Sequence, residues 1–224
     1  IKLNLSQEVF SKILGWSKKS IVRYENSDSV PQGEYLNTYM ILNENPYYIV
    51  KLLERQKNNF TEEEYYKILS ILPFSKVYKT VNTILYLLKN NKLCETSLMK
   101  HLFAVDFYNC KENKEAITNL KYAHLLYGPV VDNRNILYNF LIKNDYIKIE
   151  INDISTNFTT DKDFDKNLFT KEELNSMKLI KYKFKEYSAS ELSDWSHSFK
   201  GYIDTKNGEI IDYKYAKYLD IDNI

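Results

Sequence analysis

The chain has 224 residues, 44% of them apolar, and its 31 Lys and Arg nearly balance its 30 Asp and Glu, for a net charge of +1. This balance excludes a general polyanion binder, which needs an excess of positive charge. No apolar run approaches the length of about 18 residues that would span a bilayer. The first residues also lack the pattern of a secretory signal, so we expect a cytoplasmic protein without membrane contact.

The two cysteines, Cys94 and Cys110, stand alone and form no Cys-x-x-Cys pair. Lone thiols fit a reducing compartment and argue against both a disulfide framework and a zinc site. The three histidines, His101, His124 and His197, are dispersed, and no Cys, Asp or Glu lies at ligand spacing around them. The sequence therefore predicts neither a metal nor a cofactor.

Helical patterns dominate the first part of the chain. They cover residues 6–14, 17–26, 33–45, 46–56 and 59–72, and the last of these begins with a capping box of Thr61 and Glu64. The polar stretch 54–64 is the best candidate for a linker. We therefore expect a helix-turn-helix region at 1–54, a linker with a connecting helix at 55–75, and a second domain at 76–224.

The second domain is predicted to mix helices with short strands. Helices are expected at 75–91, 95–110, 133–145, 170–187 and 188–199, and a short one before residue 219. Capping boxes of Thr170 with Glu173 and of Ser188 with Glu191 are predicted to begin two of them. The helix at 75–91 is predicted to have one apolar face, formed by Val77, Val81, Ile84, Leu85 and Leu88. Residues 116–131 are β-like with a turn at Gly128-Pro129, and 146–151 alternates as a strand that 154–160 can pair with. The predicted class is α+β and predominantly helical: an N-terminal helix-turn-helix bundle and a C-terminal helical domain with a small β-element.

The stretch "LSQEVFSKILGWSKKSIVRYENS" has the pattern of two short helices joined by a tight turn. Ser6 can cap the first helix, Gly15 suits a left-handed turn, and Ser17 can cap the second helix. The N-terminal residues of such a second helix reach the base edges or phosphates of DNA. We therefore predict DNA contacts from Gln7, Ser17, Lys18, Lys19, Ser20 and Arg23. A plain helical hairpin with a solvated basic face is the alternative.

Residues from Leu5 to about Pro31 resemble the Xre/lambda-repressor helix-turn-helix. That family places another helix before this segment, where the present sequence has only Ile1 to Asn4. We expect the natural protein to extend further upstream. Alternatively, a second copy of the chain or the later helices would cover the apolar face around Val9, Ile13 and Ile21.

Residues from about 76 to 220 resemble the SocA-like antitoxin domain, also called Panacea. Two long stretches carry the resemblance in the right order: "SLMKHLFAVDFYNCKENKEAITNLKYAHLLYGPVVDN" and "FTKEELNSMKLIKYKFKEYSASELSDWSHSFKGYIDTKNGEIIDYKYA". The resemblance implies an antitoxin that neutralises a cognate toxin by direct contact. It also implies repression of the protein's own operon. The alternative is a protein that does not bind DNA and that either delivers the toxin to a protease or neutralises it by binding.

Charged residues on apolar helical faces mark a candidate polar cluster in this domain. Asp106 shares a face with Met99, Leu102 and Phe103, and Lys100 shares another with Phe103, Ala104 and Phe107. Half-buried charges require partners, conceivably His197 across elements. The predicted cluster, which either binds a partner or holds the fold, consists of Lys100, Asp106, Tyr127, Gly128, Pro129 and His197.

Two further motifs resemble functional sites, but their residues are better interpreted as structural. Asp161, Asp163, Asp165 and Glu172 have the spacing of a calcium loop, but Lys166 stands where such a loop needs glycine. In "SDWSH", serine, aspartate and histidine lie close in sequence, yet a hydrolase needs a nucleophile on a strained elbow. We therefore expect no enzyme. The predicted partners are a cognate toxin and double-stranded operator DNA, with a protease and a second copy of the chain as further candidates.

Overall fold

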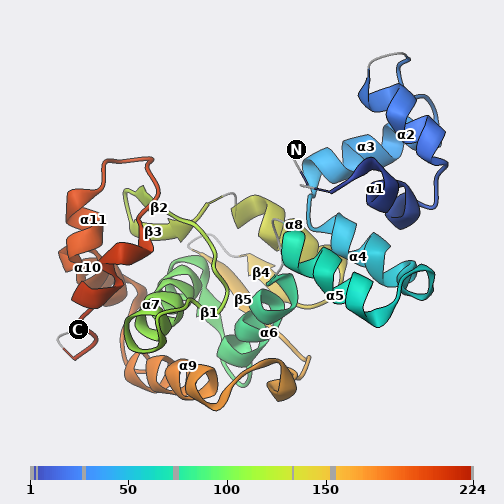
Figure 1. Ribbon diagram of the computed structural model, residues 1–224. Helices are drawn as coiled ribbons and strands as arrows, with labels where there is room; N and C mark the ends of the chain where they lie inside the picture. The colour runs from blue at the N-terminus through green and yellow to red at the C-terminus, as the bar shows by residue number, and fades with distance from the viewer. Residues whose placement is uncertain are drawn as a thin grey trace. The chain divides into compact units, whose positions relative to one another are not determined.

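The computed structural model describes residues 3, 5–26, 29–72, 76–132, 134–151 and 155–222 (Figure 1). The backbone divides into two compact units. The first comprises Ile1–Val77 together with Asn135–Phe140, and the second comprises Tyr78–Arg134 and Leu141–Ile224. Each unit has its own core, so each is described by itself.

The first unit is helical throughout the part that the structure describes. Its elements are α1 (Gln7–Leu14), α2 (Lys18–Glu25), α3 (Glu34–Glu44), α4 (Tyr48–Arg55), the 3-10 turn η1 (Lys57–Asn59) and α5 (Glu62–Ile71). Ser6 and Ser17 cap α1 and α2 as predicted, and Gly15 ends α1 with a φ of 70°. Thr61 and Glu64 form the predicted capping box on α5. Local side chains therefore fix where these helices begin and end.

The core of the first unit lies where α1 meets α2 and α4. Ile13, Ile21, Ile49 and Leu53 are fully buried there. Beside them, aromatic rings of α1, α2 and α3 gather into a cluster: the ring centroids of Trp16 and Tyr35 are 4.6 Å apart. Offset and edge-on packing of this kind stabilises the contact beyond the area it buries. The two short helices of the predicted DNA reader are thus held as one rigid pair.

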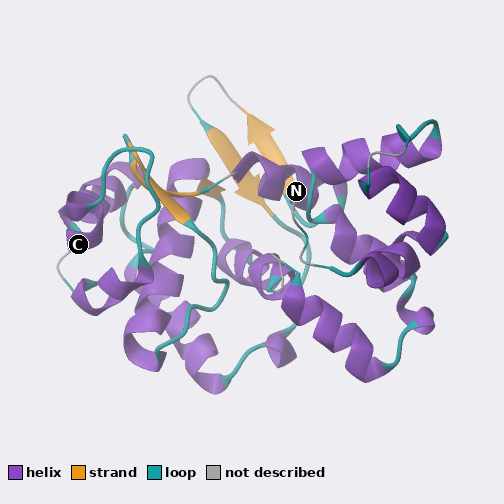
Figure 2. Cartoon of the chain, turned by 45° about the horizontal axis from the view of Figure 1, so that its top comes forward, coloured by secondary structure: helices purple, strands orange, loops and turns teal. Residues whose placement is uncertain are grey.

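The second unit combines helices with two small antiparallel sheets (Figure 2). Its helices are α6 (Val77–Leu88), α7 (Glu95–Asn113), α8 (Arg134–Lys143), α9 (Lys171–Lys183), α10 (Ala189–Ser198) and α11 (Lys200–Asp204), with 3-10 turns η2 (Lys166–Leu168) and η3 (Tyr213–Tyr218). Residues 135–140 of α8 group with the first unit, and Val77 does as well. The chain is therefore α+β and predominantly helical, which confirms the predicted class.

Helix α7 is the centre of the second unit. It packs against α9, α10, η3, β1 and β3, and in Figure 1 it lies in green between α9 and the β2–β3 strands. Its side chains are buried on nearly every face, from Leu98 through Phe107. A helix that is buried on nearly every face has no separate solvent-facing side, and this explains why α7 shows no amphipathic stripe. Polar side chains on α7 must consequently find partners inside the core.

The strands form two separate sheets. In the first, the order is β1 (Leu93–Cys94), β5 (Thr156–Thr159) and β4 (Lys148–Ile151), so the two segments predicted to pair do so. The second is a ribbon of β2 (Tyr122–Leu125) and β3 (Gly128–Val131). An isolated bridge between Ala123 and Ile210 ties the ribbon to the C-terminal segment.

The turn of this ribbon differs from the predicted one. Leu125 pairs with Gly128, so Leu126 and Tyr127 form the turn, and Gly128 and Pro129 already belong to β3. The predicted turn at Gly128-Pro129 was therefore wrong by two residues. Gly128 does have a positive φ of 91°, but this conformation serves the close packing of β3 against α7 and α10.

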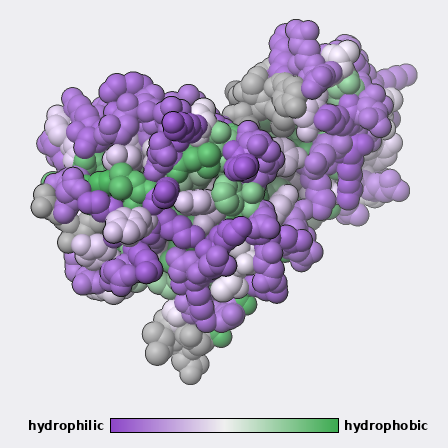
Figure 3. Space-filling view, turned by 90° about the horizontal axis from the view of Figure 1, so that it is seen from below, coloured by the Kyte–Doolittle hydropathy of each residue, from purple (hydrophilic) through white to green (hydrophobic). Residues whose placement is uncertain are grey.

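The face drawn in Figure 3 is mostly hydrophilic, with apolar areas between the polar ones. Among the helices in the described part of the chain, none is both long and apolar enough to cross a bilayer.

Candidate functional site

The predicted DNA-contacting residues lie on α1 and α2 of the first unit. Lys18, Lys19 and Arg23 are all exposed on α2, as the sequence predicted. Ser17 is occupied as the N-cap of α2: its side chain accepts a hydrogen bond from the Ser20 backbone at 3.1 Å. The structure thus brings the six predicted residues onto neighbouring turns of one helix pair.

Three of these residues make contacts that sequence reasoning missed. Lys18 forms an ion pair with Glu8 across the turn at 3.2 Å, and Gln7 donates to Glu25 at 2.8 Å. The Arg23 guanidinium lies over the ring of Tyr24, 4.9 Å from its centroid. The Lys18 pair is exposed, so it contributes little stability and opens readily. Lys18 is therefore positioned in the first turn of α2 without being locked there, and Arg23 lies in the last turn of the same helix.

In the second unit, Lys100, Gly128 and Pro129 come together. Lys100 is fully buried, and its ammonium donates to the Pro129 carbonyl at 3.1 Å. A Cβ at Gly128 would lie 2.2 Å from Ser196 Oγ and 2.7 Å from Lys100 Nζ. Only glycine permits this approach of β3 to α7 and α10. Burial lowers the pKa of Lys100 to about 7, because water no longer stabilises the ammonium.

The turn of the β2–β3 ribbon exposes two large apolar side chains. Leu126 is 74% exposed and Tyr127 is 69% exposed. The backbone beneath them is held firmly: Ser193 donates to the Tyr127 carbonyl at 3.1 Å, and the Tyr202 hydroxyl donates to the Leu125 carbonyl at 2.8 Å. An exposed apolar tip on a rigid base is typical of a protein-binding surface. We call these two residues the hairpin tip.

A small cavity lies beside the hairpin tip. Its volume is about 170 Å³. The residues that line it come from α7, the β2–β3 ribbon and the start of α8: Glu95, Thr96, Met99, Lys100, Leu125, Tyr127, Val130 and Arg134. Arg134 and Glu95 form an ion pair at 2.7 Å. The cavity therefore joins the buried Lys100 to the exposed hairpin tip.

Asp106 forms a separate polar centre further along α7. Its carboxylate accepts hydrogen bonds from the backbone N–H of Thr118 at 2.7 Å, from the hydroxyl of Tyr122 at 2.8 Å and from that of Tyr213 at 3.2 Å. The Thr118 hydroxyl donates to it as well. Burial raises the pKa of Asp106, and these hydrogen bonds oppose the shift. The centre joins α7, β2 and η3.

This geometry corrects the expected pairing. Lys100 and Asp106 were expected to be half-buried and paired, conceivably with His197, but both are fully buried and neither bonds to it. The His197 ring stacks on Tyr202 at 4.8 Å between centroids, and its buried Nε2 has no hydrogen-bond partner among the described residues. Lys100 instead donates to the Pro129 carbonyl, and Asp106 accepts from the Thr118 backbone N–H and from hydroxyl groups.

Replacing Asp106 with Leu is expected to lower the free energy of unfolding by about 3 kcal/mol. The Thr118 N–H and the Tyr122 hydroxyl would then be buried without an acceptor, and each such group costs about 1–3 kcal/mol. Asp106→Asn is the matched control. Its amide oxygen can accept the hydrogen bond from the Thr118 N–H, and its amide N–H groups can donate to the neighbouring hydroxyl oxygens. Urea unfolding measures both. Equal stability of Asp106→Leu and the parent would contradict this role.

The acidic loop before α9 is held by lysines. Asp161 pairs with Lys148, Asp163 pairs with Lys89, and Asp165 caps η2 by accepting from the Asn167 backbone. The Thr170 and Glu173 capping box on α9 is present as predicted. Two ion pairs and one helix cap therefore account for Asp161, Asp163 and Asp165, three of the four carboxylates that had the spacing of a calcium loop. Within the described residues, no group of three metal-binding side chains occurs.

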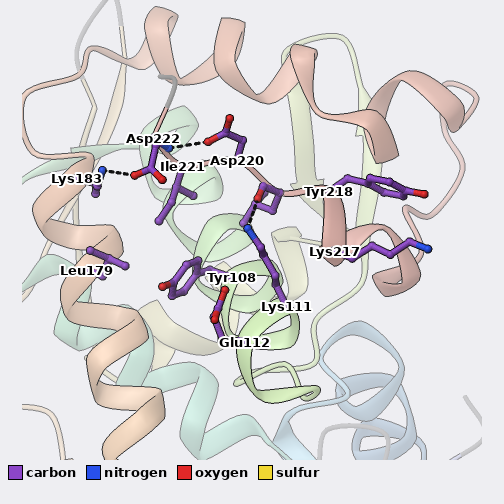
Figure 4. Close-up of a pocket in the computed structure, with 11 residues that line it drawn as sticks. Tyr108, Lys111, Glu112, Leu179, Lys183, Lys217, Tyr218, Asp220, Ile221 and Asp222 are labelled. Atoms are coloured by element: carbon purple, nitrogen blue, oxygen red, sulfur yellow. Dashed lines mark hydrogen bonds and ion pairs between the residues drawn. The ribbon is translucent and has the colours of Figure 1, made fainter.

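A larger cavity of about 420 Å³ lies near the C-terminal segment. Tyr108, Lys111 and Glu112 reach it from α7, Leu179 and Lys183 from α9, and residues 217–222 close it (Figure 4). Lys183 pairs with Asp222 at 2.6 Å, and Lys111 donates to the Leu219 carbonyl at 2.9 Å. Its lysines and acids are equal in number and already bonded in part, so we place no site there.

The comparisons with known proteins concern the second unit. Residues 98–202 match the family model described as antitoxin SocA-like, Panacea domain. The match covers slightly less than half of the chain. It includes α7 from Leu98 onward, the β2–β3 ribbon and α10, and therefore Lys100, Asp106 and the hairpin tip. Neither the curated proteins nor the solved structures contain a match to this chain.

The second unit therefore contains an antitoxin-like domain. This confirms, over residues 98–202, the resemblance predicted for residues 76–220. The Xre-type resemblance of Leu5 to Pro31 stays a prediction from the sequence. No toxin and no operator follow from the match itself.

Proposed function

We propose that this protein is the cytoplasmic antitoxin of a toxin–antitoxin system. It neutralises its toxin by direct contact through the hairpin tip, and it represses its own operon through α1 and α2. The observation that supports this most is the hairpin tip itself: two large apolar side chains stand exposed on a rigid base inside the antitoxin-like domain. Catalysis forms no part of the proposed activity.

Leu126 and Tyr127 suit this role chemically. Tyr is enriched among the residues that dominate protein–protein binding energy, and a neighbouring apolar side chain excludes water around it. The Ser193 and Tyr202 hydrogen bonds fix the backbone before binding, so little entropy is lost on docking. The pairing of charged residues around the tip, such as Arg134 with Glu95, provides a polar rim.

DNA binding is the second part of the proposal. It rests on the exposed Lys18 and Lys19 in the first turn of α2 and on the exposed Arg23 in its last turn. A second copy of the chain would place two such helices on a symmetric operator, as repressor dimers do. Four apolar side chains are at least 40% exposed in this unit: Val30, Leu36, Met40 and Ile41. They offer a surface for such a copy.

Co-expression in bacteria tests the main proposal. The full chain is expressed with the toxin encoded next to its gene, and we expect cells to survive toxin induction and the two proteins to elute together. Survival is expected to persist in a host that lacks its cytoplasmic proteases, because direct contact blocks the toxin without degrading it. If protection disappears in that host, the protein is instead an adaptor that delivers the toxin to a protease.

A further inference from the structure

The ammonium of Lys100 is buried and has more N–H donors than hydrogen bonds. Lys100 is fully buried, and its ammonium donates one hydrogen bond, to the Pro129 carbonyl. Among the described residues, no carboxylate forms an ion pair with it. Removing a cation from water without a counter-charge costs free energy, so this position is unfavourable for the isolated protein. A group that supplied the missing negative charge would be bound strongly there.

The cavity that Lys100 lines has further positive character. It opens at the first turn of α7, which Glu95 and Thr96 begin, and the N-cap residue Cys94 makes no capping hydrogen bond with its side chain. The N-terminus of a helix carries a partial positive charge and free N–H groups, both of which favour an anion. Arg134 adds a guanidinium at the same cavity. Among the described residues that line the cavity, Glu95 is the only acidic one, and it pairs with Arg134.

We propose that this cavity binds a carboxylate of the toxin, supplied by an Asp or Glu side chain inserted beside the hairpin tip. The proposal rests on the proposed function. The volume of about 170 Å³ and the apolar walls formed by Met99, Leu125 and Val130 suit a short side chain with a single charged end. Tyr127 belongs to both the cavity and the tip, so one partner segment reaches both.

Carboxylate binding should be coupled to proton uptake by Lys100. Burial lowers the pKa of Lys100 to about 7, and a carboxylate beside the ammonium favours the charged form and raises that pKa. The complex then binds more protons than the free protein, so affinity falls as the pH rises above 7. The other ionisable groups that line this cavity are Glu95 of α7, Arg134 of α8 and Tyr127 of the ribbon.

Acetate serves as the probe, and the full chain is used without a toxin. The pKa of Lys100 is measured by NMR of the lysine Cε carbons, in sodium acetate and in sodium chloride at equal ionic strength. We expect acetate to raise the pKa by about one unit or more, which corresponds to tenfold tighter binding to the charged form. Identical titrations in the two salts would overturn the proposal.

Variants separate the cavity from general charge effects. Lys100→Met removes the titrating group, and because it can also disturb the core, Arg134→Gln provides the second variant. We expect Arg134→Gln to weaken the acetate effect several-fold while the protein stays folded by circular dichroism. The control Lys92→Met removes an exposed lysine that pairs with Glu150 and should leave the acetate effect unchanged. An acetate effect that survives Arg134→Gln intact contradicts the assigned site.

The acetate and co-expression results are independent. If acetate has no effect but the chain still neutralises its toxin, the carboxylate site is wrong and the proposed function stands. If acetate binds to the cavity but the chain neither binds nor neutralises the toxin, the cavity is a carboxylate site and the proposed function is wrong. The carboxylate would then not come from a toxin.

Discussion

Changing Leu126 and Tyr127 together to Asp is expected to weaken toxin binding by at least about 100-fold. Burying two large side chains of this kind contributes about 3–6 kcal/mol, and each 1.4 kcal/mol is a factor of ten in Kd. Both residues are more than two-thirds exposed in the free protein, so the substitutions leave the core packing unchanged. Cells that carry the double variant should die on toxin induction. Affinity is measured by titration calorimetry with purified toxin.

A matched control distinguishes the hairpin tip from exposed aromatic residues in general. Tyr182 on α9 is 76% exposed, so Tyr182→Asp makes the same kind of substitution as Tyr127→Asp, with one of the two added charges, at another site of the same unit. This variant should bind the toxin as the parent does. Both variants should unfold at the parental temperature. If the tip variant protects cells fully, the toxin binds elsewhere and the central argument of the proposed function fails.

Replacing Lys18, Lys19 and Arg23 with Ala is expected to abolish specific operator binding and to leave the fold intact. Cationic side chains that bind phosphates carry most of the affinity for DNA, and those that bind guanine add about 1–3 kcal/mol each. The slope of the logarithm of affinity against the logarithm of salt concentration should also become less steep. We expect it to change by about 0.9 for each phosphate that the variant no longer neutralises. Gel retardation with the DNA upstream of the gene, at several salt concentrations, measures both effects.

The control for this experiment removes the same net charge from the other unit. Lys162, Lys178 and Lys206 are exposed, and their triple Ala variant should bind DNA as the parent does. Loss of binding in both triple variants would indicate a general charge effect. Retention of binding in the α2 variant would mean that α1 and α2 do not read DNA.

Short stretches of sequence were sufficient to predict where several helices begin or end and much of the fold class. Ser17, Thr61, Thr170 and Ser188 cap helices as predicted, and Gly15 ends α1 in a left-handed conformation. Each of these features depends on residues within about four positions, so a short stretch of sequence contains the whole cause. The same holds for the buried face of α6, where Val81, Ile84, Leu85 and Leu88 are buried as their spacing predicts.

The polar sites depended on residues that are distant in sequence. Asp106 contacts Tyr213, which lies 107 residues further along the chain, and Lys100 contacts Pro129, which lies 29 residues further along. No local sequence pattern therefore predicts either interaction. Glycine and proline together favour turns, and for that reason the sequence predicts a turn at Gly128. The positive φ of this residue serves instead to bring β3 against Lys100 and Ser196.

By itself, the sequence determined the helices, their caps and the exposed basic residues of α2, since all of these follow from near neighbours along the chain. Only the tertiary structure decided that Lys100 is buried without a counter-charge among the described residues and that Leu126 and Tyr127 stand exposed beside it. Both features arise from the packing of β3 and α10 on α7, and side chains that are distant in sequence set that packing.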